Sequence, residues 1–205
     1  MAVRPTISGE LDMSDGPLTK SKPGFERHMR DSSLREKALE HLFVGDLLRH
    51  LWCQGITDVE FLTPGVDRDG YDLVLESNGI VRHIQLKSRF RGSSVAEVDV
   101  HINLLKKPGG CVIWYEFEPN RMVIDKYYWF GDDAGRPLPA LGDRISRHSR
   151  GNQLGYKAER PQLRVVTKGR FKLLASMDEL IAALFGARPS QLSSQTASIP
   201  PADLT

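Results

Sequence analysis

Three polar residues close together in the sequence could support metal-assisted chemistry. Asp72 opens the apolar segment YDLVLE, and Gln85 and Lys87 lie in the following segment, VRHIQLKSRF. Carboxylate and amide oxygens are suitable ligands for Mg²⁺, which can activate a water molecule and polarise a phosphate. A lysine beside the metal can position that water and stabilise the developing charge. These residue types therefore indicate hydrolysis of phosphodiester bonds.

A β-hairpin is predicted to bring these three side chains together. An Asn-Gly pair between the two segments favours a tight two-residue turn, so residues 71–76 and 81–90 are expected to be paired strands. Asp72 then lies opposite the far part of the second strand. Gln85 and Lys87 share one face there, because side chains alternate along a strand with a period of two.

A helix is predicted before the hairpin, over LREKALEHLFVGDLLRHLWCQ, because its apolar residues recur at helical spacing. Ser32 or Ser33 is expected to cap its start, with Glu36 three residues after Ser33 as in a capping box. Gly55 is a suitable stop signal.

This helix carries two acids that could complete a metal site. At about 100° per residue, Glu40 falls close to the middle of the apolar stripe, where a carboxylate is costly to bury unless it binds something. Asp46 lies nearer the polar face, so Glu40 is the first choice and Asp46 its substitute. The stripe consists of Leu39, Phe43, Leu47 and Leu51.

The set Glu40, Asp72, Gln85 and Lys87 resembles the E…D…(D/E/Q)xK pattern of the PD-(D/E)XK, or restriction-endonuclease-like, nuclease superfamily. The nearest likeness is to Holliday junction resolvases and Mrr-type restriction enzymes, and it covers roughly residues 34–91. It implies an α/β fold with an αβββαβ core, in which a mixed central sheet is flanked by helices.

The resemblance also implies a role for each residue. Asp72 would be a ligand of Mg²⁺ or Mn²⁺, Gln85 a second ligand or a water-positioning group, Lys87 the catalytic lysine and Glu40 the helical acid. Two positions depart from the pattern: Tyr71 replaces the proline, and Gln85 replaces the usual carboxylate. Because an amide supplies no charge, metal affinity would depend more on the two acids.

Basic residues are concentrated downstream, where Glu159 is the single acid between Arg144 and Lys172. Such a block suits contacts with phosphates, and arginine can bind them with two hydrogen bonds. A solvated basic face is the alternative. The predicted nucleic-acid contacts are Arg89, Arg91, Arg147, Arg150, Lys157, Arg160, Lys168 and Arg170.

The 205 residues suggest a single domain over residues 31–186, between an unstructured arm at 1–30 and an unstructured tail at 187–205. The predicted order is a helix, three strands, a connection, further strands and a final helix capped by Ser176, which indicates an α/β fold with a mixed sheet. In the connection, residues 93–107, both a strand and a helix remain open.

Other classes of protein find little support in the sequence. Cys53 and Cys111 lack the spacing of a zinc site and are expected to be reduced. The start of the chain has no apolar core of a signal peptide, and no apolar run approaches the roughly 20 residues that span a bilayer. A cytoplasmic protein without a membrane partner is therefore expected.

The sequence thus predicts a metal-dependent endonuclease that acts on nucleic acid, with DNA as the expected substrate. Two other hypotheses remain: an inactive nuclease fold that binds nucleic acid or a protein, and an interaction module without a nucleic-acid role. The sequence leaves open DNA against RNA, the preferred sequence or structure, and whether the protein forms a homodimer, as many nucleases of this fold do.

Overall fold

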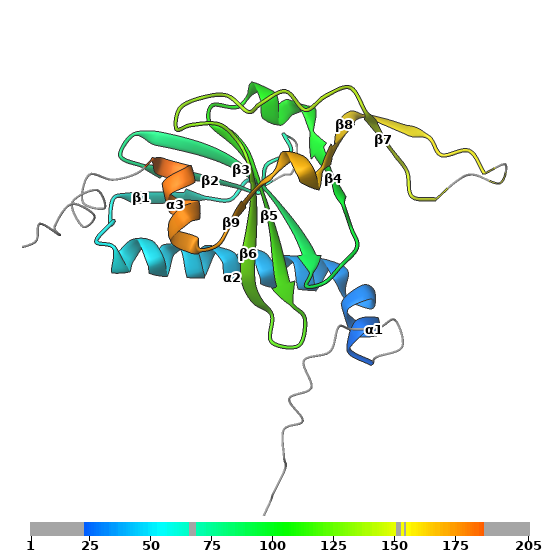
Figure 1. Cartoon of the computed structure of the whole chain (residues 1–205), viewed down its shortest axis with the longest axis horizontal. Helices are drawn as coiled ribbons and strands as arrows, with labels where there is room; N and C mark the ends of the chain where they lie inside the picture. The colour runs from blue at the N-terminus through cyan, green and yellow to red at the C-terminus, as the bar shows by residue number, and fades with distance from the viewer. Residues whose placement is uncertain (1–22, 66–68, 151–152, 154, 187–205) are drawn as a thin grey trace, which may run out of the picture.

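The computed structural model describes residues 23–65, 69–150, 153 and 155–186, which form a mixed α/β fold (Figure 1). Two helices, α2 (Ser32–Cys53) and α3 (Met177–Phe185), pack on one face of a six-stranded mixed sheet. A three-stranded sheet packs on the opposite face. The expected α/β class, with a mixed central sheet and flanking helices, is confirmed.

The six-stranded sheet has the order β1-β2-β3-β5-β6-β9. β3 and β5 run parallel, and the other neighbouring strands run antiparallel. Because β5 is central, nearly all of its side chains are buried. The strands are β1 (Val59–Leu62), β2 (Leu73–Ser77), β3 (Ile80–Phe90), β5 (Gly110–Glu118), β6 (Val123–Phe130) and β9 (Lys172–Leu174).

The three-stranded sheet has the antiparallel order β4-β8-β7, formed by β4 (Glu97–His101), β8 (Glu159–Thr167) and β7 (Ile145–Arg147). β4 and the short 3-10 helix η1 (Ile102–Lys106) connect β3 to β5. The αβββαβ arrangement expected from the sequence resemblance has an α-helix in this connection, and the structure has β4 and η1 there instead. A second 3-10 turn, η2 (Lys168–Arg170), joins β8 to β9.

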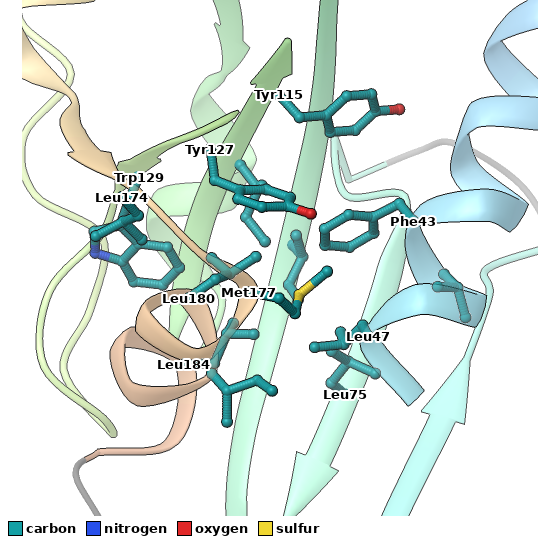
Figure 2. Close-up of a cluster of buried hydrophobic side chains, with 14 of the residues drawn as sticks. Phe43, Leu47, Leu75, Tyr115, Tyr127, Trp129, Leu174, Met177, Leu180 and Leu184 are labelled. Atoms are coloured by element: carbon teal, nitrogen blue, oxygen red, sulfur yellow. The ribbon is translucent and has the colours of Figure 1, made fainter. Parts of the chain in front are cut away.

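The larger core lies between the helices and the six-stranded sheet (Figure 2). Phe43 of α2 stacks on Tyr115 of β5 with ring centroids 5.7 Å apart. Leu180 and Leu184 of α3 are fully buried in the same cluster. Each such apolar side chain stabilises the fold by about 1.5–3 kcal/mol. This packing fixes α2 over β3 and β5.

A second core joins the two sheets. Val112 and Trp114 of β5 face Val100 of β4 and Val166 of β8, and all four side chains have no exposed surface. Alternate residues of β5 therefore enter different cores, which explains why this strand reads as a continuous apolar run.

The turn and one helix cap agree with the sequence patterns. Asn78 and Gly79 have φ angles of 52° and 74°, and positive φ at both central residues is what a type I′ turn requires. At the start of α3, the Ser176 hydroxyl accepts a hydrogen bond of 3.2 Å from the backbone N–H of Glu179.

The predicted capping box of the first long helix is wrong. The N-cap of α2 is Asp31, and its side chain makes no capping hydrogen bond. A preceding helix, α1 (Pro23–Arg30), leads directly into α2, and the Asp31 N–H donates to the Arg27 carbonyl at 2.9 Å. Helical hydrogen bonds thus continue across the junction, so a serine cap is not needed.

α1 also corrects the expected extent of the unstructured arm, because residues 23–30 are helical. His28 is buried, and its Nε2 donates to the Pro119 carbonyl at 3.0 Å. Its ring packs edge-on against Phe90. Residues 1–22 and the expected tail at 187–205 lie outside the described residues. Within the described part of the chain, no helix is long and apolar enough to cross a membrane.

Candidate functional site

A cavity of about 480 Å³ lies between the N-terminal half of α2 and the C-terminal part of β3. Three of the four predicted catalytic residues, Glu40, Asp72 and Lys87, line it. They come from a helix and from the two arms of the hairpin. The lining consists of Ser33, Glu36, Lys37, Glu40, Asp72, Leu86, Lys87, Ser88 and Tyr115.

Asp72 immediately precedes β2 and is held against β3 by two hydrogen bonds. Its backbone N–H donates to the Ile84 carbonyl at 2.8 Å, and its Oδ2 accepts from the Leu86 N–H at 2.5 Å. Leu73 is paired with Ile84, so the register continues the hairpin to Asp72. The hairpin thus fixes the carboxylate of Asp72 beside Leu86, the residue that precedes Lys87, as the sequence pattern predicts.

The helix contributes two acids to the cavity. Glu40, whose side chain is 17% exposed, pairs with Lys37 at 2.8 Å. Glu36 lies one turn earlier on the same helix face and pairs with Arg35 at 3.1 Å. The sequence predicts Glu36 in a capping box, but its side chain lines the cavity instead. Its spacing of four residues from Glu40, typical of one helix face, is the signal that could have found it.

Tyr115 is the one aromatic side chain in the lining of this cavity. Burial raises the pKa of its hydroxyl, and the negative charges of Asp72, Glu40 and Glu36 raise it further. The phenol therefore stays protonated at neutral pH and can donate a hydrogen bond. The cavity thus combines three carboxylates, the ammonium groups of Lys37 from α2 and Lys87 from β3, and one neutral phenol.

Gln85, the fourth predicted residue, lies outside the described lining of this cavity. It is buried, and its Oε1 accepts a hydrogen bond of 3.3 Å from the backbone N–H of His101 in β4. Along β3, Ile84 and Leu86 pack in the core under the helices, while Gln85 has the opposite parity and meets β4. The described cavity lining thus does not include Gln85, whose amide is bonded to β4, and its role as a metal ligand stays a prediction.

The segment that carries Asp72 is held tightly against the β4–η1 connection. Gly70 has φ +73°, and a Cβ built on it would lie 2.1 Å from the Cβ of His101. The Asp69 carboxylate pairs with Lys107 at 2.6 Å, and this hydrogen bond raises the pKa of Lys107. The same ammonium lies 5.3 Å from the ring centroid of Tyr71. β4 and η1 therefore help to position Asp72.

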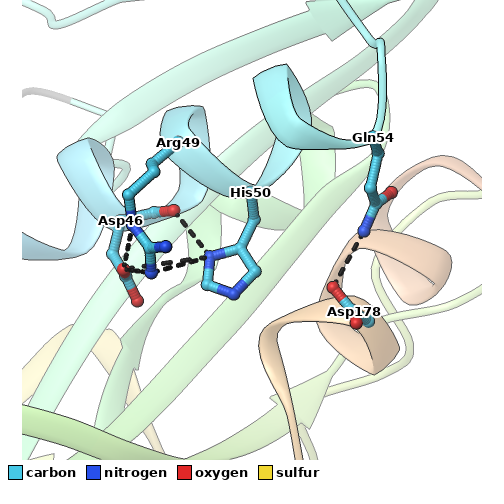
Figure 3. Close-up of polar contacts among 5 residues, drawn as sticks. All are labelled: Asp46, Arg49, His50, Gln54 and Asp178. Atoms are coloured by element: carbon cyan, nitrogen blue, oxygen red, sulfur yellow. Dashed lines mark hydrogen bonds and ion pairs between the residues drawn. The ribbon is translucent and has the colours of Figure 1, made fainter.

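Asp46, the substitute for Glu40, is engaged elsewhere on α2 (Figure 3). Its carboxylate pairs with Arg49 at 2.6 Å and lies 3.8 Å from Nδ1 of His50. It is not part of the described cavity lining. Nearby, Gln54 donates to Asp178 of α3 at 2.8 Å, which ties the two helices together. Asp46 thus belongs to a surface network rather than to the candidate site.

Two of the predicted nucleic-acid contacts lie on or beside β3 and are already paired. Arg89 is 7% exposed, lies 3.3 Å from the carboxylate of Glu116 and packs over Trp114. Its burial removes it from the surface, which corrects its assignment as a phosphate contact. Arg91 is exposed and pairs with Asp125.

The other predicted contacts divide into two groups. Lys168 packs over the ring of Tyr128 at 4.7 Å, and Arg170 donates to the Leu141 carbonyl at 2.6 Å. These two follow β8 and lie against the body of the protein. The second group belongs to β7, β8 and the residues between them, and its members are exposed: Arg147, Arg150, Lys157 and Arg160.

Neither a family model nor a curated protein sequence matches this chain. A solved structure of a bacterial homing endonuclease, I-Ssp6803I, is similar to it with a TM-score of 0.31 and 17% sequence identity. The similar region covers 62% of this chain and 86% of the endonuclease chain. A similarity this low says nothing about the activity of the present chain.

Proposed function

We propose that this protein is a metal-dependent endonuclease that hydrolyses phosphodiester bonds of DNA. The observation that carries the proposal is the cavity shared by Glu40, Asp72 and Lys87. These residues are separated in sequence and come from three elements, yet they face one space. Acids with an adjacent lysine are the groups that metal-assisted phosphodiester hydrolysis requires.

The oxygen donors of the cavity suit a hard divalent cation such as Mg²⁺ or Mn²⁺. Magnesium is usually bound by one or two carboxylates and keeps several waters. Asp72 and Glu40 would hold the ion, and Glu36 offers a further carboxylate. The ion would supply Lewis acidity toward the phosphate. Gln85, as a neutral amide bonded to β4, is left to support the strand rather than to bind the ion.

The protein's own groups have distinct tasks in this proposal. Lys87 would orient the attacking water and stabilise negative charge on the phosphate. Lys37 would have to release Glu40 for ligation. The Lys37 ammonium and the Glu40 carboxylate lie 2.8 Å apart, and the lysine side chain is 58% exposed. Exposed pairs contribute about 0–1 kcal/mol, so this rearrangement costs little.

Cleavage of supercoiled plasmid and of branched duplex DNA, with Mg²⁺ or Mn²⁺, tests the proposal. We expect Asp72→Asn, Glu40→Gln and Lys87→Ala each to lower the rate by about 10²-fold or more. Asp46→Asn is the matched control, because it removes an acid of the same helix outside the cavity, and its rate should equal that of the wild type. Cleavage that persists in both Asp72→Asn and Lys87→Ala would refute the assignment.

A second function, binding of nucleic acid without cleavage, is favoured by one observation. In the part of the chain that the structure describes, no group of three or more His, Cys, Asp or Glu side chains is arranged to hold a metal ion. Calorimetric titration with Mn²⁺ separates the two functions. A chain that binds DNA in EDTA, binds no Mn²⁺ and leaves all DNA substrates intact would have the binding function alone.

A further inference from the structure

A β-ribbon projects from the body of the protein (Figure 1). We call it the β7–β8 ribbon, and it comprises the described residues of the range 145–164. β4 pairs with the second half of β8, from Leu163 to Thr167, whereas Ser146 and Arg147 of β7 pair with the first half. All described residues from 147 to 162 are exposed. The ribbon is therefore two strands wide at Ser146–Arg147 and Glu159–Arg160, and it continues outward into exposed residues that, where the structure describes them, form no regular strand.

The ribbon is anchored at its base by acids of β4. The Asp99 carboxylate accepts from the Ser146 hydroxyl at 2.7 Å and lies 3.4 Å from Arg160. Arg144 makes two hydrogen bonds to Glu97, at 2.6 and 3.0 Å. Beyond this base the ribbon has no core, and a two-stranded ribbon without one is only marginally stable in water. Its exposed side chains are therefore free of a hydrophobic core of their own and accessible to a binding partner.

The charge of the ribbon shows which kind of partner it suits. Glu159 is the single acid in the range 144–164. It pairs with Arg147 at 3.0 Å, and the two side chains are 45% and 63% exposed. Such surface pairs contribute about 0–1 kcal/mol, so a phosphate can replace the glutamate. The basic residues are Arg144, Arg147, Arg150, Lys157, Arg160 and Arg164.

We propose that the β7–β8 ribbon binds in the major groove of B-form duplex DNA. Antiparallel strands lie about 4.8 Å apart, and a two-stranded ribbon with its side chains matches a groove roughly 12 Å wide. The major groove of A-form RNA is deep and narrow and does not admit such a ribbon. The inference rests on the proposed function for its choice of nucleic acid, and it adds the form of the substrate.

The base of the ribbon has a bulge that supports this placement, and a cavity lies beside it. A bulge between Ile145 and Ser146 interrupts the pairing with β8, and bulges bend and twist a ribbon away from its sheet. A cavity of about 650 Å³ lies along the base, and both acidic and basic side chains line it. The excess of cations therefore lies on the exposed residues beyond the base, which include Arg150.

Fluorescence anisotropy with a labelled duplex of three helical turns, in EDTA, measures binding without cleavage. We expect the double variant Arg150→Ala/Lys157→Ala to bind at least about tenfold more weakly at moderate salt. The slope of log Kobs against log salt should fall by about 1.8, because each lost phosphate contact removes about 0.9. The matched control, Arg121→Ala/Arg136→Ala, removes two exposed arginines outside the ribbon and should bind like the wild type.

Two further measurements use the wild-type chain and do not depend on how a variant folds. Double-stranded RNA and single-stranded DNA of the same sequence should compete at least about tenfold more weakly than the duplex. Methylation of guanine N7, an atom of the major groove, should be blocked where the protein binds. Equal competition by the RNA, unprotected N7, or wild-type binding by Arg150→Ala/Lys157→Ala would each overturn the proposal.

These results are separable from those that test the nuclease. If the ribbon proposal fails but Asp72→Asn abolishes cleavage, the candidate active site stands and DNA is held elsewhere. If the ribbon protects the major groove but no cleavage occurs with either metal, the nuclease proposal fails alone.

Discussion

Gly70→Ala tests whether the β4–η1 connection holds the segment that carries Asp72. Gly70 has φ +73°, where an L side chain costs about 1–2 kcal/mol. The new Cβ would also meet the Cβ of His101 at 2.1 Å, so the two segments must move apart. Overpacking of this kind typically costs about 1–3 kcal/mol. We therefore expect a loss of about 2–5 kcal/mol in the free energy of unfolding.

Two other glycines separate the causes of this loss. Gly79 has φ +74°, and a Cβ there would have no atom within 4 Å, so Gly79→Ala should cost about 1–2 kcal/mol. Gly65 lacks a positive φ and also has open space, so Gly65→Ala should change stability by less than about 0.5 kcal/mol. Urea unfolding measures the free energy of unfolding of all three variants. In thermal unfolding, each loss of 1 kcal/mol corresponds to a decrease in Tm of about 2–4 °C.

The nuclease assay supplies a second reading of the same variants. Displacement of His101 would break its hydrogen bond to Gln85 and shift Asp72, so Gly70→Ala should lose more cleavage activity than Gly79→Ala under conditions where both are folded. If Gly70→Ala and Gly79→Ala are equally stable, the close approach to His101 has no energetic consequence and the reasoning fails.

Three further predictions concern buried groups. Burial raises the pKa of the Cys111 thiol to about 12, so a thiol reagent at neutral pH should modify the exposed Cys53 alone, and both cysteines only after unfolding. Burial lowers the pKa of His28, so the unfolded chain takes up a proton before the folded chain as pH falls through about 6.5. The free energy of unfolding should therefore decrease as pH falls below that value. In urea titrations, His28→Gln should weaken this dependence of stability on pH. Glu116→Gln leaves the buried Arg89 without its acid partner and should lower the free energy of unfolding by about 3–5 kcal/mol. The exposed control Glu159→Gln should lower it by less than about 1 kcal/mol. Similar losses in the two variants would show that the buried pair contributes no more than an exposed one.

The hairpin and its position beside Asp72 could be predicted because their determinants are local. The turn residues fix the register, and the register fixes which residues of β3 lie near Asp72. Glu40 could be predicted from the apolar stripe around it for the same reason. For Gln85, strand alternation predicts the face of the side chain but not what covers that face, and its role as a metal ligand stays a prediction. β4 covers that face, and its His101 N–H donates to the amide oxygen of Gln85.

Long-range packing explains the other differences. The helix over residues 23–30 is short, and it is fixed by a contact of His28 with the distant Pro119. The basic block reads as one unit in the sequence, but η2 and β9 turn its last residues back onto the body. Arg89 reads as a surface cation on an alternating strand. Its acid partner, Glu116, lies on the neighbouring parallel strand, a pairing that sequence spacing does not reveal.

The path of the chain through β4 has a consequence for cooperativity. Between the adjacent strands β3 and β5 the chain leaves the six-stranded sheet, adds β4 to the other sheet and then returns. Neither sheet can be completed without the other, and Val100 and Leu104 of this detour are fully buried between them. The two sheets should therefore open as one unit, so amides of β3 and of residues 163–167 should exchange with solvent at similar free energies. The outer ribbon lies beyond this unit and can open while the rest of the molecule stays folded.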